Sequence, residues 1–538
     1  MFITVNIHQA NALRNQRYAF TDRFTLVSEL LQNARRAGAS RIEMVYDEAQ
    51  QTLQVRDNGT GIQDFQTLLS LHESGWASDL RDAEQAFGVG FSQCLYRARH
   101  CRITSGRQRI DFDCDAALAQ QPIEVLNAPE ALDGTCVELD GVELPDWQVR
   151  IAQLCMGFPV PLHLNGQELP RPLALAALKT QPTEIGEVFL LGRDDGCCTR
   201  QLLVFLQGFC VWHSPWGLNE LANVVHLDPQ QFLARLPDRD KLLDEDQQLA
   251  RIHAVLERCW QQVLEERVTT LDAEQFLARY TYCVHRWKQQ ALLNHLDLLP
   301  EANYQVFRDY PVQSRNGLGE GLQAATHPLH RQQIERAAVQ LVELAPLNEL
   351  NAAVWMFARA CNYRVCEHQA LDEQHWVHPH VKVLETEALQ VTVLQEQYRG
   401  WFESRWISAP VVLCAAVRLQ IGNRMVDITD EGLCHDAVLY IPAGERSGQV
   451  VRQAMNYVDE HDYVHEDDAE ADSVALAELV RHLRSRDPLH TLRALLSELQ
   501  LDRYPALQGQ RFAVSVGHQP SDLGLACLDV QGGDHAQP

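Results

Sequence analysis

The chain has 538 residues, of which 46% are hydrophobic and 22% charged, and its 46 Lys and Arg against 72 Asp and Glu give a formal net charge of −26. This composition is typical of a folded, soluble protein and excludes a disordered or fibrous chain. Because an acidic surface repels phosphate backbones and anionic lipid, it disfavours general binding to nucleic acid or membrane surfaces. At roughly 100 to 200 residues per domain, the length predicts about three domains.

Cysteine usage and the apolar runs indicate the compartment. The 15 cysteines are odd in number and include the adjacent pair Cys197 and Cys198 but no CxxC motif. We therefore expect reduced thiols in a reducing compartment. Residues 1–10 lack the pattern of a secretion signal, and the most apolar run, Val411 to Val417, is far shorter than the ~20 residues of a membrane span. We expect a cytoplasmic protein that does not enter a membrane.

The first domain, residues 1–165, is predicted to be α+β. Apolar residues at helical spacing predict a helix over 24–37, which Gly38 ends. A β-hairpin with strands at 41–46 and 52–56 follows, then a second helix at 65–71 and a loop without periodicity at 73–84. Three strand-like pieces and a proline-rich stretch complete the domain, at 102–104, 109–112, 136–139 and 159–172. An α/β sandwich of helices packed on a sheet is the expected architecture.

Two further regions follow. Residues 166–300 are predicted to form an α+β middle domain, with β-like runs at 188–191 and 201–211 and a helix over 245–266. Residues 301–538 are predicted to be mixed and partly helical. This last region begins with a glycine-rich loop at 314–321, and a helix-rich stretch follows it. The next predicted elements are a strand at 411–421 and an acidic stretch at 459–472, which is expected to be a solvated loop. Two helices, at 475–484 and 488–499, close the chain.

Four short segments of the first domain carry polar or glycine-rich motifs. Glu29 and Asn33 lie one turn apart at the flank of the first helix's apolar stripe. DNGTG at 57–61 follows a strand, where glycines let the backbone approach a flat ligand and a carboxylate can accept a hydrogen bond from an amine. FGVGF at 87–91 opens a helix, where backbone N–H groups can bind phosphate oxygens. DGTCVEL at 133–139 places a hydroxyl at the start of a strand.

Each motif alone is also common in ordinary surface helices and turns. Together, and in this order, the four segments resemble the GHKL ATPase domain shared by DNA gyrase, the ninety-kilodalton heat-shock chaperones, sensor histidine kinases and MutL. ELLQNARRAGASRIEMVYD at 29–47 is similar to the first box of MutL-type proteins, and AFGVGFSQCLY at 86–96 to the lid of the heat-shock chaperones. The resemblance implies the GHKL (Bergerat) α/β sandwich.

The resemblance also implies roles for individual residues. Glu29 would be the general base that orients the attacking water, Asn33 would bind Mg²⁺, and Asp57 would bind the adenine amine of ATP. Gly59 and Gly61 would pack near the adenine ring, and Gly88 and Gly90 would contact the phosphates. The hydroxyl of Thr135 would support the carboxylate of Asp57.

The middle domain carries one further match. Residues 205–211, 224–229 and 236–241, followed by a helix, are similar to the segment of the heat-shock chaperones that delivers an arginine to the γ-phosphate. The resemblance makes this a transducer-like domain with Arg239 as the catalytic cation and Lys241 as its substitute. The alternative is that Arg239 is a solvated residue at a helix start.

Three positions depart from the GHKL pattern. Arg36 stands where the family commonly has Asp, Gln85 occupies the first glycine position of the lid, and residues 73–78 contain no lysine. These departures bear on nucleotide affinity and turnover, and we expect any ATPase to be slow.

The resemblance implies a Mg²⁺-dependent ATP-binding and ATP-hydrolysing conformational clamp like the heat-shock chaperones, a homodimer that acts on a protein client. One alternative is a MutL- or MORC-like DNA-associated ATPase, or a prokaryotic defence or phage-encoded ATPase, although the acidic charge argues against DNA. Another is an ATP-gated binding module with negligible turnover. The client, the pathway and the role of residues 301–538 stay open.

Six cysteines and histidines gather at 361–380, at Cys361, Cys366, His368, His375, His378 and His380. Thiolate and imidazole ligands suit Zn²⁺, but the spacing matches no standard site. Buried thiols beside surface histidines are the alternative that we favour.

Overall fold

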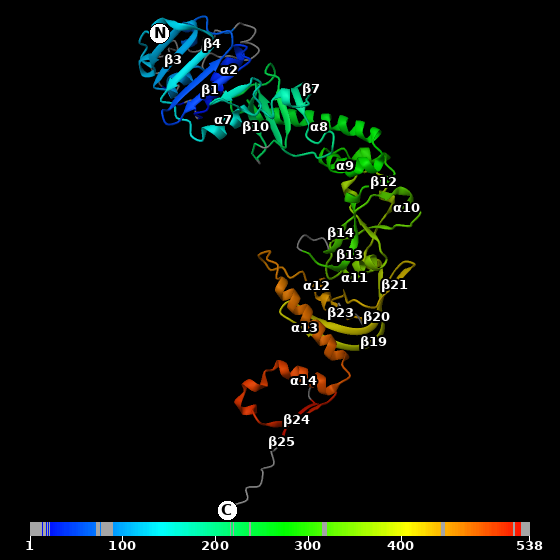
Figure 1. Ribbon diagram of the computed structural model, residues 1–538. Coiled ribbons are helices and arrows are strands. Elements are labelled where there is room, and N and C mark those ends of the chain that lie inside the picture. Colours follow the sequence, from blue (N-terminus) through cyan, green and yellow to red (C-terminus); the bar gives the residue numbers. More distant parts are fainter. Residues whose placement is uncertain are drawn as a thin grey trace, which may run out of the picture. The chain divides into compact units, whose positions relative to one another are not determined.

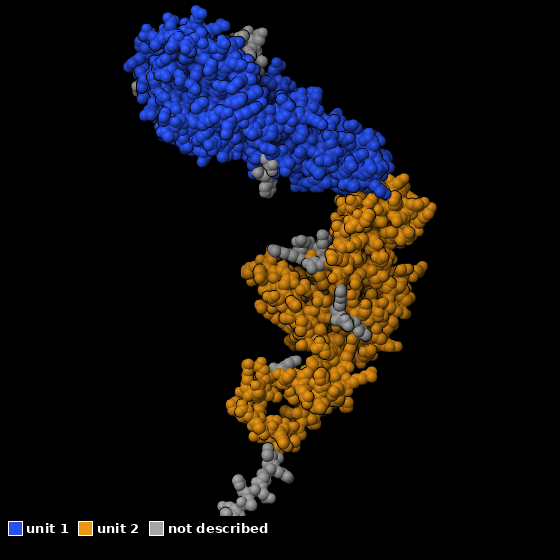
Figure 2. Space-filling model, viewed as in Figure 1, with its two compact units in different colours: residues 1–296 blue, residues 297–538 orange. Residues whose placement is uncertain are grey.

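The computed structural model describes residues 22–70, 90–215, 217–218, 220–235, 238–314, 320–442, 447–519 and 522–528, and also Leu13, Asn15, Tyr18, Phe20 and Trp76. The chain divides into two compact units, unit 1 (residues 1–296) and unit 2 (residues 297–538) (Figure 2). Both combine helices with β-sheets, which confirms the predicted α+β class (Figure 1). Within the described ranges, no helix has both the length and the apolar character needed to cross a membrane. The domain boundaries at 165 and 300 remain predictions.

Unit 1 begins with a six-stranded sheet of order β3-β4-β2-β1-β5-β6. Its strands are β1 (Ile42–Asp47), β2 (Thr52–Asp57), β3 (His100–Asp113), β4 (Val125–Asp140), β5 (Leu162–Leu164) and β6 (Gln167–Glu168). The hairpin of β1 and β2 confirms the alternation in the sequence. The short strands predicted at 102–104 and 109–112 are one strand of 14 residues, β3, which pairs with the 16-residue β4 through register shifts. These irregularities interrupt the apolar alternation in the sequence, although the backbone pairing of the two strands continues. Thr135 therefore lies inside β4, and the prediction that it stands at the start of a strand is wrong.

Helices cover one face of this sheet. They are α2 (Thr25–Arg36), α3 (Phe65–Leu69), α5 (Ser92–Arg97), α6 (Cys114–Leu118) and α7 (Trp147–Cys155). The apolar stripe of α2 shares one core with alternate residues of β1 and β2, and these core residues are Leu26, Val27, Leu30, Leu31, Ala34, Ile42, Met44, Leu53 and Val55. Since burying each large apolar side chain contributes about 1.5 to 3 kcal/mol, this packing fixes the rotation of α2. The polar residues that flank the stripe are thereby held at the edge of the core.

A second sheet of unit 1 has the order β10-β9-β11-β8-β7. Its strands are β7 (Gln181–Thr183), β8 (Gly186–Phe189), β9 (Leu202–Leu206), β10 (Phe209–His213) and β11 (Asn223–Leu227), followed by α8 (Glu245–Thr270) and α9 (Ala273–Arg286). The β-like run at 201–211 is therefore two antiparallel strands, which turn at Gln207 and Gly208. All five residues of β9 and all five of β11 are buried, as expected for a parallel pair at the centre of a covered sheet.

Unit 2 is mainly β-structure between residues 298 and 441, so the prediction of a helix-rich stretch there is wrong. Its strands are β12 (Leu298–Leu299), β13 (Tyr304–Val312), β14 (Glu320–Ala324), β15 (Leu329–His330), β16 (Leu341–Glu343), β17 (Arg364–Cys366), β18 (Val381–Val383), β19 (Leu389–Glu403), β20 (Ser408–Ile421), β21 (Arg424–Ile428), β22 (Leu433–His435), β23 (Val438–Ile441), β24 (Arg511–Val516) and β25 (Leu523–Leu528). Its α-helices are α10 (Arg331–Glu335), α11 (Ala352–Ala360), α12 (Val451–Ala454), α13 (Glu466–Arg484) and α14 (Pro488–Glu498). The strand expected at 411–421 and the two closing helices are confirmed.

The acidic stretch of unit 2 is only partly a loop. Residues 466–472 form the first two turns of α13, where acidic side chains interact favourably with the helix dipole. Asp472 is buried and accepts hydrogen bonds from the Tyr457 hydroxyl at 2.9 Å and from Ser404 Oγ at 2.8 Å. The prediction of a solvated loop is therefore wrong for this half, because tertiary partners satisfy the carboxylate.

Candidate functional site

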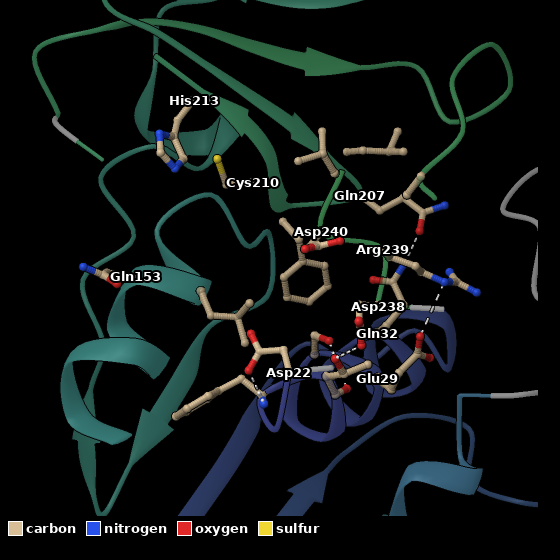
Figure 3. A pocket seen from close by; sticks show the side chains of 18 of the residues that line it. Asp22, Glu29, Gln32, Gln153, Gln207, Cys210, His213, Asp238, Arg239 and Asp240 are labelled. Carbon is tan, nitrogen blue, oxygen red and sulfur yellow. Dashed lines mark hydrogen bonds and ion pairs between the residues drawn. The ribbon is translucent and has the colours of Figure 1, made fainter. Parts of the chain in front are cut away.

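A cavity of about 440 Å³ lies in unit 1 between α2 and the later segments around β9, β10 and residues 229–234 and 238–240 (Figure 3). Four polar residues of α2, at 25, 28, 29 and 32, line it. Their spacing of three and four residues places them on one face of the helix. On the opposite side, the cavity wall comes from the turn after β9 and from the loop that precedes α8.

Three side chains on this face of α2 bind side chains of the later segments. They are Thr25, whose hydroxyl donates to Asp238 Oδ1 at 2.8 Å, Glu29, whose Oε1 lies 3.4 Å from Arg239 Nε, and Gln32, whose amide donates to Gln207 Oε1 (Figure 3). We call these three pairs the α2 contact row. Since α2 also belongs to the core of the first sheet, the row ties the first sheet's layer to the second.

The backbone positions Arg239 and Gln207 in an unusual way. Both have a positive φ, 57° for Arg239 and 55° for Gln207, a conformation that costs non-glycine residues of order 1 kcal/mol or more. The Arg239 amide donates to Arg235 O at 2.9 Å. The Arg239 side chain is only 17% exposed, and α8 does not begin until Glu245. Arg239 is therefore neither solvated nor at a helix start, and Lys241 is exposed.

Glu29 also meets the segment in which the lid was predicted. Gly90 lies two residues before the first residue of α5, and a Cβ at this position would overlap Glu29 Oε2. The buried carboxylate of Glu29 thus lies between the backbone of Gly90 and the guanidinium of Arg239. Gly88, Gln85 and residues 73–78 other than Trp76 lie outside the described residues.

Asp57 ends β2 as a buried carboxylate. Its Oδ1 accepts a hydrogen bond from the Gly59 amide at 2.8 Å, and it is paired across the sheet with Thr135. Burial raises the pKa of Asp57, while hydrogen bonds from the backbones of Gly59 and Thr135 oppose that rise. Gly134 has φ +88°, and a Cβ there would overlap the Asp57 carbonyl oxygen. Thr135 is therefore the neighbour of Asp57 across the sheet, and support of the Asp57 carboxylate by the Thr135 hydroxyl stays a prediction.

The glycines of the DNGTG segment are required by packing within the protein. A Cβ at Gly59 would lie 2.6 Å from Ala37 Cβ, and one at Gly61 would lie 2.7 Å from Ser105 Oγ. Ser105, which the sequence did not single out, accepts from the Ile62 amide at 2.8 Å and donates to the Gly134 carbonyl at 2.9 Å. This buried hydroxyl joins Ile62, the residue that follows the DNGTG segment, to β4.

Of the residues proposed from the sequence, Glu29 and Arg239 line the cavity, whereas Asn33, Asp57, Gly59, Gly61, Gly90 and Thr135 do not. Asn33 is half-buried one turn beyond Glu29, and Arg36 is buried in the last turn of α2. The contact-row residues Thr25, Gln32, Gln207 and Asp238 were missed. The helical periodicity of Thr25, Glu29 and Gln32 was the available signal, but it does not identify the partner.

The oxygen of Asn33 is a suitable ligand for Mg²⁺, which usually keeps water and phosphate oxygens as its other ligands. Among the described residues, no group of three or more His, Cys, Asp or Glu side chains is placed to hold a metal ion. That result covers the cluster at 361–380. There His368 Nδ1 lies 2.8 Å from His378 Nδ1. His375 is buried, so the prediction of a surface histidine is wrong for it, and burial is the main cause that lowers its pKa to about 4.

No protein-family model matches the sequence, and a search of curated proteins found no significant match. The geometry of unit 1 and the motif resemblance are therefore the grounds for a functional proposal.

Proposed function

We propose that unit 1 binds ATP with Mg²⁺ and hydrolyses it slowly, as a GHKL (Bergerat) conformational clamp in which the segment carrying Arg239 acts as a transducer. The observation that carries this proposal is the ion pair of Glu29 and Arg239. The resemblance assigns a general base and a γ-phosphate-binding cation to two separate segments, and both roles require the residues to meet at one end of the nucleotide. The distance of 3.4 Å between Arg239 Nε and Glu29 Oε1 meets that requirement.

The proposed chemistry uses the carboxylate of Glu29 as an acceptor for a proton of the attacking water. In the absence of nucleotide, Arg239 neutralises this carboxylate. A triphosphate offers the guanidinium several anionic oxygens, so Arg239 would shift from Glu29 to the phosphate and release the carboxylate to orient water. Asn33 would hold Mg²⁺, which when bound neutralises part of the triphosphate charge.

At the other end of the proposed nucleotide site, Asp57 would accept a hydrogen bond from the adenine amine. Its burial favours this role, because a carboxylate shielded from water gains more from a ligand donor. Movement of Arg239 between Glu29 and phosphate would alter the α2 contact row. Nucleotide state would thereby change how the two layers of unit 1 are held, which is the basis of a clamp.

We also propose that the clamp is a homodimer and that a second copy covers the C-terminal end of unit 2. Helix α14 and the ribbon of β24 and β25 leave many large apolar side chains exposed: Leu489, Leu495, Leu499, Phe512, Val516, Leu523, Leu525 and Leu528. A two-stranded ribbon is marginally stable alone. Residues 485–528 carry four arginines and four acidic residues in a chain of net charge −26, so this is a segment where two copies would not repel each other. Light scattering should give a dimer mass that Leu525→Asp lowers.

The ATPase proposal is tested by calorimetry with ATP and Mg²⁺ and by phosphate release. Asp57→Asn should abolish binding, and Glu29→Ala should retain binding but lower turnover about 10²- to 10⁴-fold, the usual contribution of a general base. Asp140→Asn, an exposed carboxylate at the end of β4, and Glu43→Gln, in an exposed ion pair, are matched controls that should change neither quantity. Absence of ATP binding by the unaltered protein would refute the proposal.

An ATP-gated module with negligible turnover is the second candidate, because the ion pair with Arg239 occupies the carboxylate that hydrolysis needs. In that case the unaltered protein would bind ATP, release phosphate no faster than Glu29→Ala, and still change conformation on binding. A DNA-associated ATPase would instead show turnover stimulated by duplex DNA.

A further inference from the structure

Two thiols from distant segments of unit 1 meet beside α9. Cys198 is half-buried in the loop that follows β8, and Cys283 is fully buried on α9. Both residues donate to one acceptor in this loop, the Gly196 carbonyl oxygen, the Cys198 amide at 2.8 Å and Cys283 Sγ at 3.1 Å. The shared acceptor places Cys198 beside the Cys283 thiol. The adjacent Cys197 is exposed.

Close backbone packing holds this loop on α9. Gly196 has φ +82°, and a Cβ there would overlap the carbonyl oxygen of Arg279 in α9. The Tyr280 hydroxyl donates to Arg193 O at 3.0 Å, and the Gly196 amide donates to Gly192 O at 2.7 Å. The loop is thus attached to α9 at Arg193 and at Gly196, two residues before Cys198, so the position of Cys198 relative to Cys283 is built into the fold.

The surroundings give the two thiols different reactivity. The hydrogen bond from Cys283, the guanidinium of Arg286 and the side chain of Trp287 lower the pKa of Cys198 against the effect of its partial burial. The hydrogen bond to Cys198 and burial raise the pKa of Cys283. Elsewhere, burial raises the pKa of structural thiols such as Cys155, to about 12. Cys198 therefore has the character of a nucleophile and Cys283 that of a protonated partner.

We propose that Cys198 and Cys283 are a peroxide-reactive thiol pair that closes to a disulfide. The Cys198 thiolate attacks one oxygen of hydrogen peroxide, which forms a sulfenic acid and releases hydroxide. Cys283 sulfur then attacks the sulfur of the sulfenic acid, the S–S bond forms, and the hydroxyl leaves as water with the proton of the Cys283 thiol. The two thiols lose two electrons, peroxide gains them, and a dithiol reductant reverses the reaction.

The disulfide would tie the loop after β8 covalently to α9. A transient bond of this kind is compatible with a reducing compartment, where protein disulfides are usually catalytic or redox-sensing. Oxidation of this thiol pair requires no bound ATP.

The test uses the full-length protein, reduced, desalted, treated with hydrogen peroxide, alkylated and digested with trypsin. Cleavage after arginine places Cys198 in the peptide 194–200 and Cys283 in the peptide 280–286. Mass spectrometry should find these two peptides joined, and the link should persist in Cys197→Ser, the matched control. It should be absent from Cys198→Ser.

Trapping with dimedone tests the order of the steps. In Cys283→Ala the sulfenic acid on Cys198 has no partner and should accumulate as the dimedone adduct, with thermal unfolding of the variant recorded as a check on its fold. Alkylation of both thiols after peroxide treatment, a link that uses Cys197, or a Cys283→Ala protein that is folded but forms no adduct would each overturn the assignment. Should Cys283→Ala fail to fold, the joined peptides in Cys197→Ser decide the proposal alone.

Discussion

The Glu29–Arg239 ion pair allows the most direct test of the arrangement in unit 1. The two side chains are 7% and 17% exposed, and their closest charged atoms lie 3.4 Å apart. At an effective dielectric constant of about 20, two unit charges at this distance attract by about 5 kcal/mol. Removing both from water takes back part of this energy, so we expect a net coupling of about 2 kcal/mol. Removing one partner should cost more, about 3 to 5 kcal/mol, because the other charge stays buried.

A double-mutant cycle measures this coupling. Glu29→Gln, Arg239→Met and the double variant are compared with the unaltered protein by urea unfolding, following the transition of unit 1. Each single variant should be destabilised, and the double variant should be more stable than the sum of the two losses predicts. Glu184→Gln with Arg258→Met is a matched control pair in the same unit, with side chains 58% and 55% exposed. Its coupling should be within the 0 to about 1 kcal/mol typical of surface pairs.

The ion pair is refuted if the destabilisation by the Glu29 and Arg239 substitutions is additive within about 0.5 kcal/mol, as it is for substitutions at distant sites. Additivity would mean that the two charges do not meet in solution. It would also remove the observation that carries the proposed ATPase mechanism.

Two further predictions concern stability. Burial, with a smaller contribution from neighbouring positive charge, lowers the pKa of His375 to about 4. Because the pKa in the folded protein lies below the unfolded value of about 6.5, the free energy of unfolding should decrease as the pH falls from 6.5 to 4, by about 3 kcal/mol in all. Urea unfolding at pH 7.5 and 4.5 measures this loss, which should be smaller in His375→Gln. Gly134→Ala should cost more than about 2 kcal/mol because its Cβ would overlap the Asp57 carbonyl. Gly166→Ala, with a similar positive φ but nothing within 4 Å, should lose only about 1 kcal/mol in the same assay, and equal losses would contradict the steric argument.

Local periodicity was enough to predict the elements that bury one apolar face. The stripe of Leu26, Leu30 and their neighbours predicts α2 to within one residue at each end, and alternation predicts β1 and β2. The same patterns failed where burial depends on a distant partner. The acidic residues that begin α13 were predicted to form a loop. The hydrogen-bond donors to the Asp472 carboxylate, Tyr457 and Ser404, lie elsewhere in the sequence, so the local pattern does not reveal them.

By itself the sequence determined the fold class, the first helix and hairpin, and the identities of Glu29, Asn33 and Asp57 as candidates. Only the tertiary structure decided that α2 binds the later segments through Thr25, Glu29 and Gln32, and that Cys198 meets Cys283. The physical reason is that periodicity records that a face is buried, whereas the choice of partner depends on packing between segments far apart in the chain.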